Sequence, residues 1–148
     1  MAKVSPFLWF VGNMKDAVDF YVSVFKDARV LEMGPMSARF ELLGREFLAL
    51  NAHPHRPFTE AISFFVEVED QEEIDYYWRA LLAGGGKEQM CGWLKDRFGV
   101  SWQVTPTVLP QMLQDKDPEK AKRVMAAMLQ MKKINIDGLK RAYEGRAA

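Results

Sequence analysis

The chain has 148 residues and is 49% hydrophobic, so it is long enough for one domain, or for two half-size modules, around a buried core. Its 20 basic and 20 acidic residues balance, which argues against nucleic acid or an acidic membrane as a partner. The single cysteine, Cys91, excludes an internal disulfide and is typical of a reducing compartment. Because there is no signal-peptide pattern and no run of about 18 apolar residues, we expect a cytoplasmic protein.

The first part of the chain predicts a strand, a helix and three further strands. An apolar and aromatic run over residues 6–11 has the pattern of a buried strand and ends at Gly12. We expect a helix to follow, capped by Asn13, because apolar residues recur at helical spacing from Met14 to Phe25. Three strands are then expected, over residues 28–33, 38–43 and 46–50, with glycine-containing turns between them.

The second part predicts the same order of elements. A buried strand is expected over residues 61–68, followed by a helix in which Asp70 and Glu73 form a D-x-x-E variant of the capping box. The glycines at 84–86 follow this helix and precede no Lys-Ser or Lys-Thr pair, which favours a helix end over a phosphate-binding loop. Further strands are expected over residues 88–95 and 100–105.

The two parts are also similar in sequence. WFV at residues 9–11 is matched by FFV at 64–66, and GREF at 44–47 by GVSW at 99–102, both 55 residues later. A shared offset across separated segments predicts two copies of one supersecondary unit. We therefore expect an α+β fold of two tandem βαβββ modules that form a curled mixed sheet with a cleft. The expected boundaries are about 4–51 and 61–106 for the modules and 1–131 for the domain.

Residues 107–148 predict a C-terminal helical extension outside the repeat. Asp117 is expected to cap a helix with Pro118 in its first position. An apolar stripe follows, formed by Ala121, Val124, Met125, Met128 and Leu129. The methionines at 112, 125, 128 and 131 either belong to the core or line an adaptable surface for a ligand or partner.

Three segments carry a resemblance to a known family: PFLWFVGNMKDAVDFYVSVF, EAISFFVEVEDQEEIDYYW and CGWLKDRFGVSWQVTP. Together they resemble the vicinal oxygen chelate superfamily of glyoxalases, bleomycin-resistance proteins and dioxygenases. Within it, the chain is similar to the PhnB-like branch described as 3-demethylubiquinone-9 3-methyltransferase-like. The resemblance implies paired modules around a cleft, commonly in a homodimer.

The resemblance also implies where a divalent metal would bind. The four positions from which superfamily enzymes hold their metal correspond here to Pro6, Leu48, Ala61 and Gln103. Only Gln103 carries a donor, and one neutral amide cannot hold a catalytic divalent cation against water, so we expect no metal. We expect no other cofactor either, because the first strand-to-helix turn lacks the glycine-rich loop of a conventional adenosylmethionine enzyme.

If the metal positions face the cleft, strand alternation places other side chains on its wall. Leu8, Phe10, Ser63, Phe65 and Gln103 are then expected to face the cleft, and Phe7, Trp9, Phe47, Phe64 and Trp102 to face the helices. The candidate ligand-binding residues are Phe10, Asn51, His55, Ser63, Phe65, Trp93 and Gln103. A closed, fully packed core is the alternative. The His53 and His55 pair could bind a metal or a proton, or could simply be exposed on its loop, and Cys91 is either a nucleophile or an inert thiol.

These observations leave three functions open. The first is a metal-free protein that binds an aromatic or amphipathic small molecule in the cleft. The second is an enzyme of the vicinal oxygen chelate or methyltransferase-like type that uses Gln103, Ser63, Asn51 or His55 with an external cofactor. The third is a dimer whose cleft has lost its function. We expect a homodimer in each case, because such sheets have exposed edges.

Overall fold

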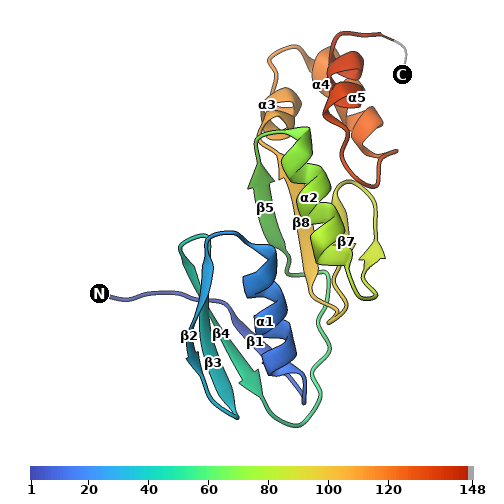
Figure 1. Ribbon diagram of the computed structural model, residues 1–148. Coiled ribbons are helices and arrows are strands. Elements are labelled where there is room, and N and C mark those ends of the chain that lie inside the picture. The colour runs from blue at the N-terminus through green and yellow to red at the C-terminus, as the bar shows by residue number, and fades with distance from the viewer. Residues whose placement is uncertain (147–148) are drawn as a thin grey trace. The chain divides into compact units, whose positions relative to one another are not determined.

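The computed structural model describes residues 1–146 of the chain, so the last two residues of the predicted extension lie outside the described part. The fold is α+β, as predicted, and contains two four-stranded mixed sheets (Figure 1). The chain divides into two compact units, residues 1–57 and residues 58 onward. Among the described helices, none is long and apolar enough to span a bilayer.

The first unit is one βαβββ module, as predicted. Its elements are β1 (Phe7–Phe10), α1 (Met14–Val24), β2 (Ala28–Met33), β3 (Ser37–Leu42) and β4 (Arg45–Asn51). The strands are arranged in the order β1-β4-β3-β2, and β1 runs parallel to β4. Helix α1 covers one face of this sheet (Figure 1).

Aromatic rings join α1 to the first sheet. The Tyr21 ring of α1 stacks on Phe40 of β3 at 6.2 Å between centroids, and Phe40 stacks on Phe47 of β4 at 5.3 Å. Tyr21 and Phe40 are completely buried, which explains the apolar stripe along the helix. The expected side-chain cap is wrong, because Asn13 makes no capping hydrogen bond; its backbone carbonyl accepts from the Ala17 amide instead.

The second unit begins with the second βαβββ module. It contains β5 (Phe64–Val68), α2 (Gln71–Leu82), β6 (Lys87–Glu88), β7 (Trp93–Lys95) and β8 (Ser101–Pro106). The strand order, β5-β8-β7-β6, repeats that of the first sheet, and β5 runs parallel to β8. The strand expected over residues 88–95 is instead divided into β6 and β7, because Cys91 adopts a left-handed conformation with φ of 62°.

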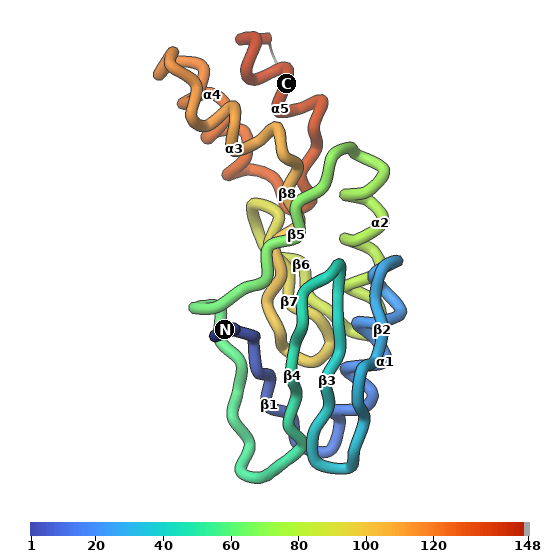
Figure 2. Tube along the Cα trace, turned by 90° about the vertical axis from the view of Figure 1, so that its left-hand side faces the viewer, coloured from blue at the N-terminus to red at the C-terminus, as the bar shows by residue number. Residues whose placement is uncertain are grey.

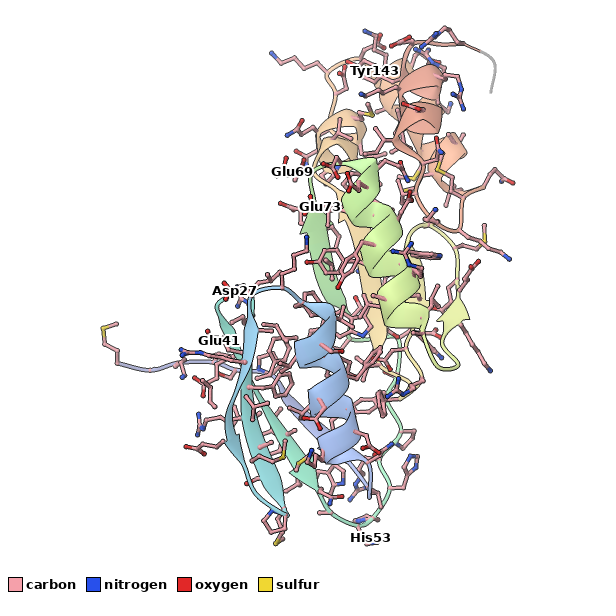
Figure 3. All side chains as sticks on the ribbon, in the orientation of Figure 1. Asp27, Glu41, His53, Glu69, Glu73 and Tyr143 are labelled. Carbon is pink, nitrogen blue, oxygen red and sulfur yellow. The ribbon has the colours of Figure 1, made fainter. Side chains whose placement is uncertain are left out.

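The N-terminus of α2 is capped as the sequence predicts, with one difference. The Asp70 carboxylate accepts a hydrogen bond from the Glu73 amide at 2.9 Å. The Glu73 carboxylate accepts from the Glu69 amide at 2.8 Å, one residue before the position of the usual capping box. Figure 3 labels Glu69 and Glu73 at this end of the helix. Two otherwise unsatisfied amides therefore receive acceptors.

The described part of the C-terminal extension contains three helices, α3 (Val108–Leu113), α4 (Pro118–Met128) and α5 (Ile136–Tyr143). Helices α4 and α5 lie side by side (Figures 1 and 2). The predicted cap of α4 is confirmed, since the Asp117 carboxylate accepts from the Glu119 amide at 3.0 Å. Of the methionines, Met112 belongs to the core, whereas Met125 is 41% exposed.

The segment between α4 and α5 docks on the second module. The Cys91 and Gly92 amides donate to the carbonyls of Met131 and Lys132 at 2.7 and 2.8 Å. The Gln71 side chain donates to the Ile134 carbonyl at 3.0 Å and accepts from the Ile136 amide at 2.8 Å. Ile134 is completely buried between these contacts. This segment is therefore anchored to the module by its backbone and by the Ile134 side chain.

Candidate ligand-binding site on the second sheet

The candidate site lies on the face of the second sheet that is opposite α2, here called the distal face. In the register of the sheet, Gln103 of β8 pairs with Phe65 of β5 on one side and with Trp93 of β7 on the other. Paired residues place their side chains on the same face. The alternate residues Trp102 and Val104 are buried on the α2 side. Three predicted ligand-binding residues therefore stand in one row.

A fourth predicted residue, Ser63, is hydrogen-bonded to this row. The Gln103 Nε2 atom donates to Ser63 Oγ at 2.9 Å, which fixes the orientation of the amide. Within residues 1–146, no group donates to Gln103 Oε1. The Phe65 ring beside it is 49% exposed, and Gln103 and Trp93 are partly exposed. The distal face thus presents an amide oxygen between two aromatic side chains.

A second, polar row lies next along the same face. Ser101 is two residues from Gln103 on β8 and pairs with Lys95 of β7. The Ser101 hydroxyl is buried and has no hydrogen-bond partner among the described residues. The Lys95 Nζ atom lies 2.7 Å from Glu60 Oε1, and the same oxygen accepts from Gln89 Nε2 at 3.0 Å. These hydrogen bonds, led by that from Lys95, hold the pKa of the Glu60 carboxyl below its usual value.

The expectation that Leu8 and Phe10 face the cleft is wrong. Both are buried on the α1 side, where Leu8 pairs with Ala49, and Phe7 pairs with Leu48 on the opposite face. The 55-residue offset holds for β4 and β8 but not for β1 and β5. The buried residues of β1 are Leu8 and Phe10, and those of β5 are Val66 and Val68. The two strands therefore correspond at an offset of 58 residues. The similar aromatic triplets of β1 and β5 therefore differ in register, and Phe10 belongs to the core of the first unit.

Asn51 and His55, the other predicted site residues, lie in the first unit. The Asn51 side chain connects two turns: its Oδ1 accepts from the Gly12 amide at 2.6 Å, and its Nδ2 donates to the Pro35 carbonyl at 3.2 Å. This amide therefore has a structural role. His55 is exposed on the loop after β4, where Figure 3 labels its neighbour His53. The next residue, Arg56, lies over the Trp9 ring at 5.7 Å.

Comparison with solved structures defines the class of protein. A PhnB protein of Bacillus cereus is 32% identical, with a TM-score of 0.64, and the match covers 72% of this chain and 100% of that one. A glyoxalase-related enzyme from Fulvimarina pelagi (14% identity, TM-score 0.55, 74% and 91% covered) and the fosfomycin resistance protein FosX of Listeria monocytogenes (14%, 0.54, 70% and 91%) share the fold. The fold is that of the vicinal oxygen chelate superfamily.

The particular family is given by a sequence model. The model of the 3-demethylubiquinone-9 3-methyltransferase family matches residues 2–105, and the chain belongs to this family. A comparison with curated proteins finds no match. The matched residues end within β8, so the three helices of the extension lie outside the family model.

The metal of this superfamily does not fit the residues of this chain. Pro6, Leu48 and Ala61 carry no donor at the positions implied by the resemblance. The observed register does not supply a metal donor either. The residue beside Leu48 on β1 is Phe7, and the residue beside Gln103 on β5 is Phe65. Within residues 1–146, no group of three His, Cys, Asp or Glu side chains is arranged to hold an ion.

The β1–α1 turn does not have the glycine-rich loop of a conventional adenosylmethionine enzyme either. The turn contains a single glycine, Gly12, whose φ is 80°. The Gly12 amide, which could otherwise bind an anionic group, already donates to Asn51 Oδ1. The one glycine amide of this turn is therefore occupied by a partner within the first unit.

Sequence reasoning placed Ser101 on the cleft wall but missed Lys95 and Glu60. Lys95 and Ser101 have the same parity as Trp93 and Gln103, so strand alternation predicts that all four share a face once the register of β7 and β8 is known. Glu60 could not be assigned from a periodic pattern, because it precedes β5 in an irregular segment and reaches Lys95 only in the folded chain.

Proposed function

We propose that this protein binds a flat small organic molecule on the distal face of its second sheet and needs no metal of its own to do so. The observation that carries the proposal is the Gln103–Ser63 hydrogen bond, which fixes a polar amide between Phe65 and Trp93. Few polar groups among aromatic walls are the usual composition of a small-molecule site.

The spacing of the strands supports a flat ligand. Neighbouring strands lie about 4.8 Å apart, so Phe65 and Trp93, which are separated by β8, stand about 10 Å apart at the backbone. An aromatic ring stacked between two others needs about 3.5 Å on each side. A flat molecule that stands with its edge toward Gln103 would fit between Phe65 and Trp93 and could stack on both. It would donate to the free Oε1 atom.

A methyltransferase of the 3-demethylubiquinone type is the second candidate, and the family match favours it. A phenolic ring could occupy the same place beside Gln103, so both candidates use the same face. They differ in chemistry, since the methyltransferase would also have to bind a methyl donor. The β1–α1 turn lacks the glycine-rich loop of a conventional adenosylmethionine enzyme, which favours binding over methyl transfer.

A binding assay with 2-naphthamide, a flat amide with a hydrogen-bonding edge, tests the proposal. Fluorescence titration in the presence of EDTA is expected to show saturable binding to the wild-type chain. Trp93→Ala is expected to weaken binding by about tenfold, corresponding to about 1.4 kcal/mol of lost stacking. An equal loss on Trp9→Ala, in the first unit, would contradict the location. Formation of a methylated phenol from adenosylmethionine would favour the second candidate.

A further inference from the structure

We propose that Lys95 and Glu60 make the site selective for flat aromatic carboxylates, a proposal that rests on the function proposed above. Lys95 would bind the carboxylate of the ligand, and Glu60 would occupy the same cation when no ligand is bound. Phe65 and Trp93 would stack on the ring.

The register places Lys95 within reach of such a ligand. Lys95 is two residues from Trp93 on β7, so the two side chains lie on the same face about 7 Å apart. A carboxylate on a ring beside Trp93 would extend over this distance. The pairing of Lys95 with Ser101 brings the cation and a hydroxyl into one row.

The charge of this row favours an anion. Lys87 of β6 pairs with Lys95 across the sheet, so two cations lie next to one another. Lys87 is exposed and forms no ion pair among the described residues, whereas Lys95 has one partner, Glu60. The row therefore has two cations, Lys87 and Lys95, and one carboxylate, Glu60. An anionic ligand would neutralise the remaining positive charge.

The Glu60–Lys95 pair is replaceable. The Glu60 side chain is 53% exposed and that of Lys95 is 33% exposed. Ion pairs this close to water contribute little to stability because the solvent screens them. Glu60 also belongs to an irregular segment before β5, which leaves it free to move away when another carboxylate arrives.

Ser101 provides an independent indication of a ligand. Its side chain is 1% exposed, and its hydroxyl has no partner among the described residues. Buried hydroxyls are normally hydrogen-bonded, so this one lacks an acceptor. A carboxylate oxygen of a ligand bound by Lys95 would lie next to Ser101 and would accept a hydrogen bond from its hydroxyl.

Two probes with the same naphthalene ring system distinguish carboxylate selectivity from binding of the ring alone. 2-Naphthoate carries the carboxylate, and 2-naphthamide is its neutral counterpart. Wild-type protein is expected to bind the naphthoate about tenfold more tightly. Lys95→Met is expected to remove this preference and to leave naphthamide binding unchanged, whereas Lys122→Met on α4, an exposed lysine, serves as the matched control.

Glu60→Gln is expected to change naphthoate affinity in the opposite direction from Lys95→Met. This substitution keeps the shape of the side chain but frees Lys95, so naphthoate is expected to bind several-fold more tightly than to wild type, with naphthamide unchanged. Equal binding of both probes, with no effect of either substitution, would overturn carboxylate selectivity and leave the ligand site in place. Failure of both probes to bind would overturn the site and the selectivity together. Thermal melting verifies that each variant is folded.

Discussion

The Trp102 indole donates a hydrogen bond from Nε1 to the Asp96 carboxylate at 2.9 Å, inside the second unit. Asp96 is 3% exposed and also accepts from the amides of Phe98 and Val100 at 2.8 and 3.1 Å. These bonds close the turn between β7 and β8 and therefore fix the register that places Gln103 beside Trp93.

Trp102→Phe is therefore expected to destabilise the protein. It removes one donor from a buried carboxylate, which costs about 1.5–3 kcal/mol, and lowers the melting temperature by several degrees. Trp93→Phe is the matched control, because the Trp93 indole is partly exposed and makes no hydrogen bond within the described chain. Equal melting temperatures of the two variants would show that the indole–carboxylate bond has no structural role.

Ile134→Ala is expected to release the C-terminal extension from the second module. Ile134 is completely buried, and truncation of such a side chain costs about 2–5 kcal/mol. The Cys91 and Gly92 amides, which bond to Met131 and Lys132, should then exchange their hydrogens much faster. Ile62, which is 73% exposed, supplies the control Ile62→Ala. Unchanged exchange at Cys91 and Gly92 would contradict this mode of docking.

A carboxyl–phenol pair within the extension predicts two pH effects. The Tyr143 hydroxyl donates to Asp115 Oδ2 at 2.6 Å, and Figure 3 labels Tyr143 on α5. This bond, the largest cause in each case, lowers the pKa of Asp115 from 3.8 and raises the pKa of Tyr143 from 10.0. The stability from Asp115 is present above its unfolded pKa and is lost as the pH falls through its folded pKa. That from Tyr143 is present below pH 10.0 and is lost as the pH rises through its folded pKa.

Tyr143→Phe tests the effect of the phenol on Asp115. The Asp115 pKa, followed by NMR titration of its carboxyl carbon, is expected to rise toward its ordinary value of 3.8. Tyr76→Phe is the control, because Tyr76 lies on α2. An Asp115 pKa that stays the same in Tyr143→Phe would show that the phenol does not stabilise the carboxylate in solution.

The chain is predicted to form a homodimer. Strand β2 is an edge of the first sheet, and its Val30 and Leu31 side chains are 38% and 37% exposed. An exposed edge with apolar side chains favours association. Light scattering at micromolar concentration is expected to give twice the chain mass of 17.0 kDa. A mass of 17.0 kDa under these conditions would contradict the prediction.

Much of the fold could be predicted from the sequence because local signals agreed with one another. The helical spacing from Met14 and from Ile74 and the capping residues Asp70 and Asp117 all correspond to observed features. The failures have physical causes. Similar aromatic triplets concealed a change of register between β1 and β5, and left-handed Cys91 divided one expected strand into two.

The site was predictable only in part. Strand alternation places Ser63, Phe65 and Gln103 on one face, and the observed sheet adds Trp93 to them. Asn51 could not be recognised as a structural residue, because its partners Gly12 and Pro35 come from turns that only the folded chain brings together. The same holds for Glu60, whose partner Lys95 is 35 residues away.

The most direct test of the central proposal is Gln103→Leu, measured in EDTA by naphthamide titration and thermal melting beside Gln111→Leu, an exposed position on α3, as the control. Loss of the polar contact from the free Oε1 atom is expected to weaken binding by about tenfold or more, equivalent to about 1.4 kcal/mol. The melting temperature should be unchanged or higher, because Leu fits an apolar row. A Gln103→Leu variant that melts several degrees lower but binds naphthamide as wild type does would contradict the proposal and make the residue structural.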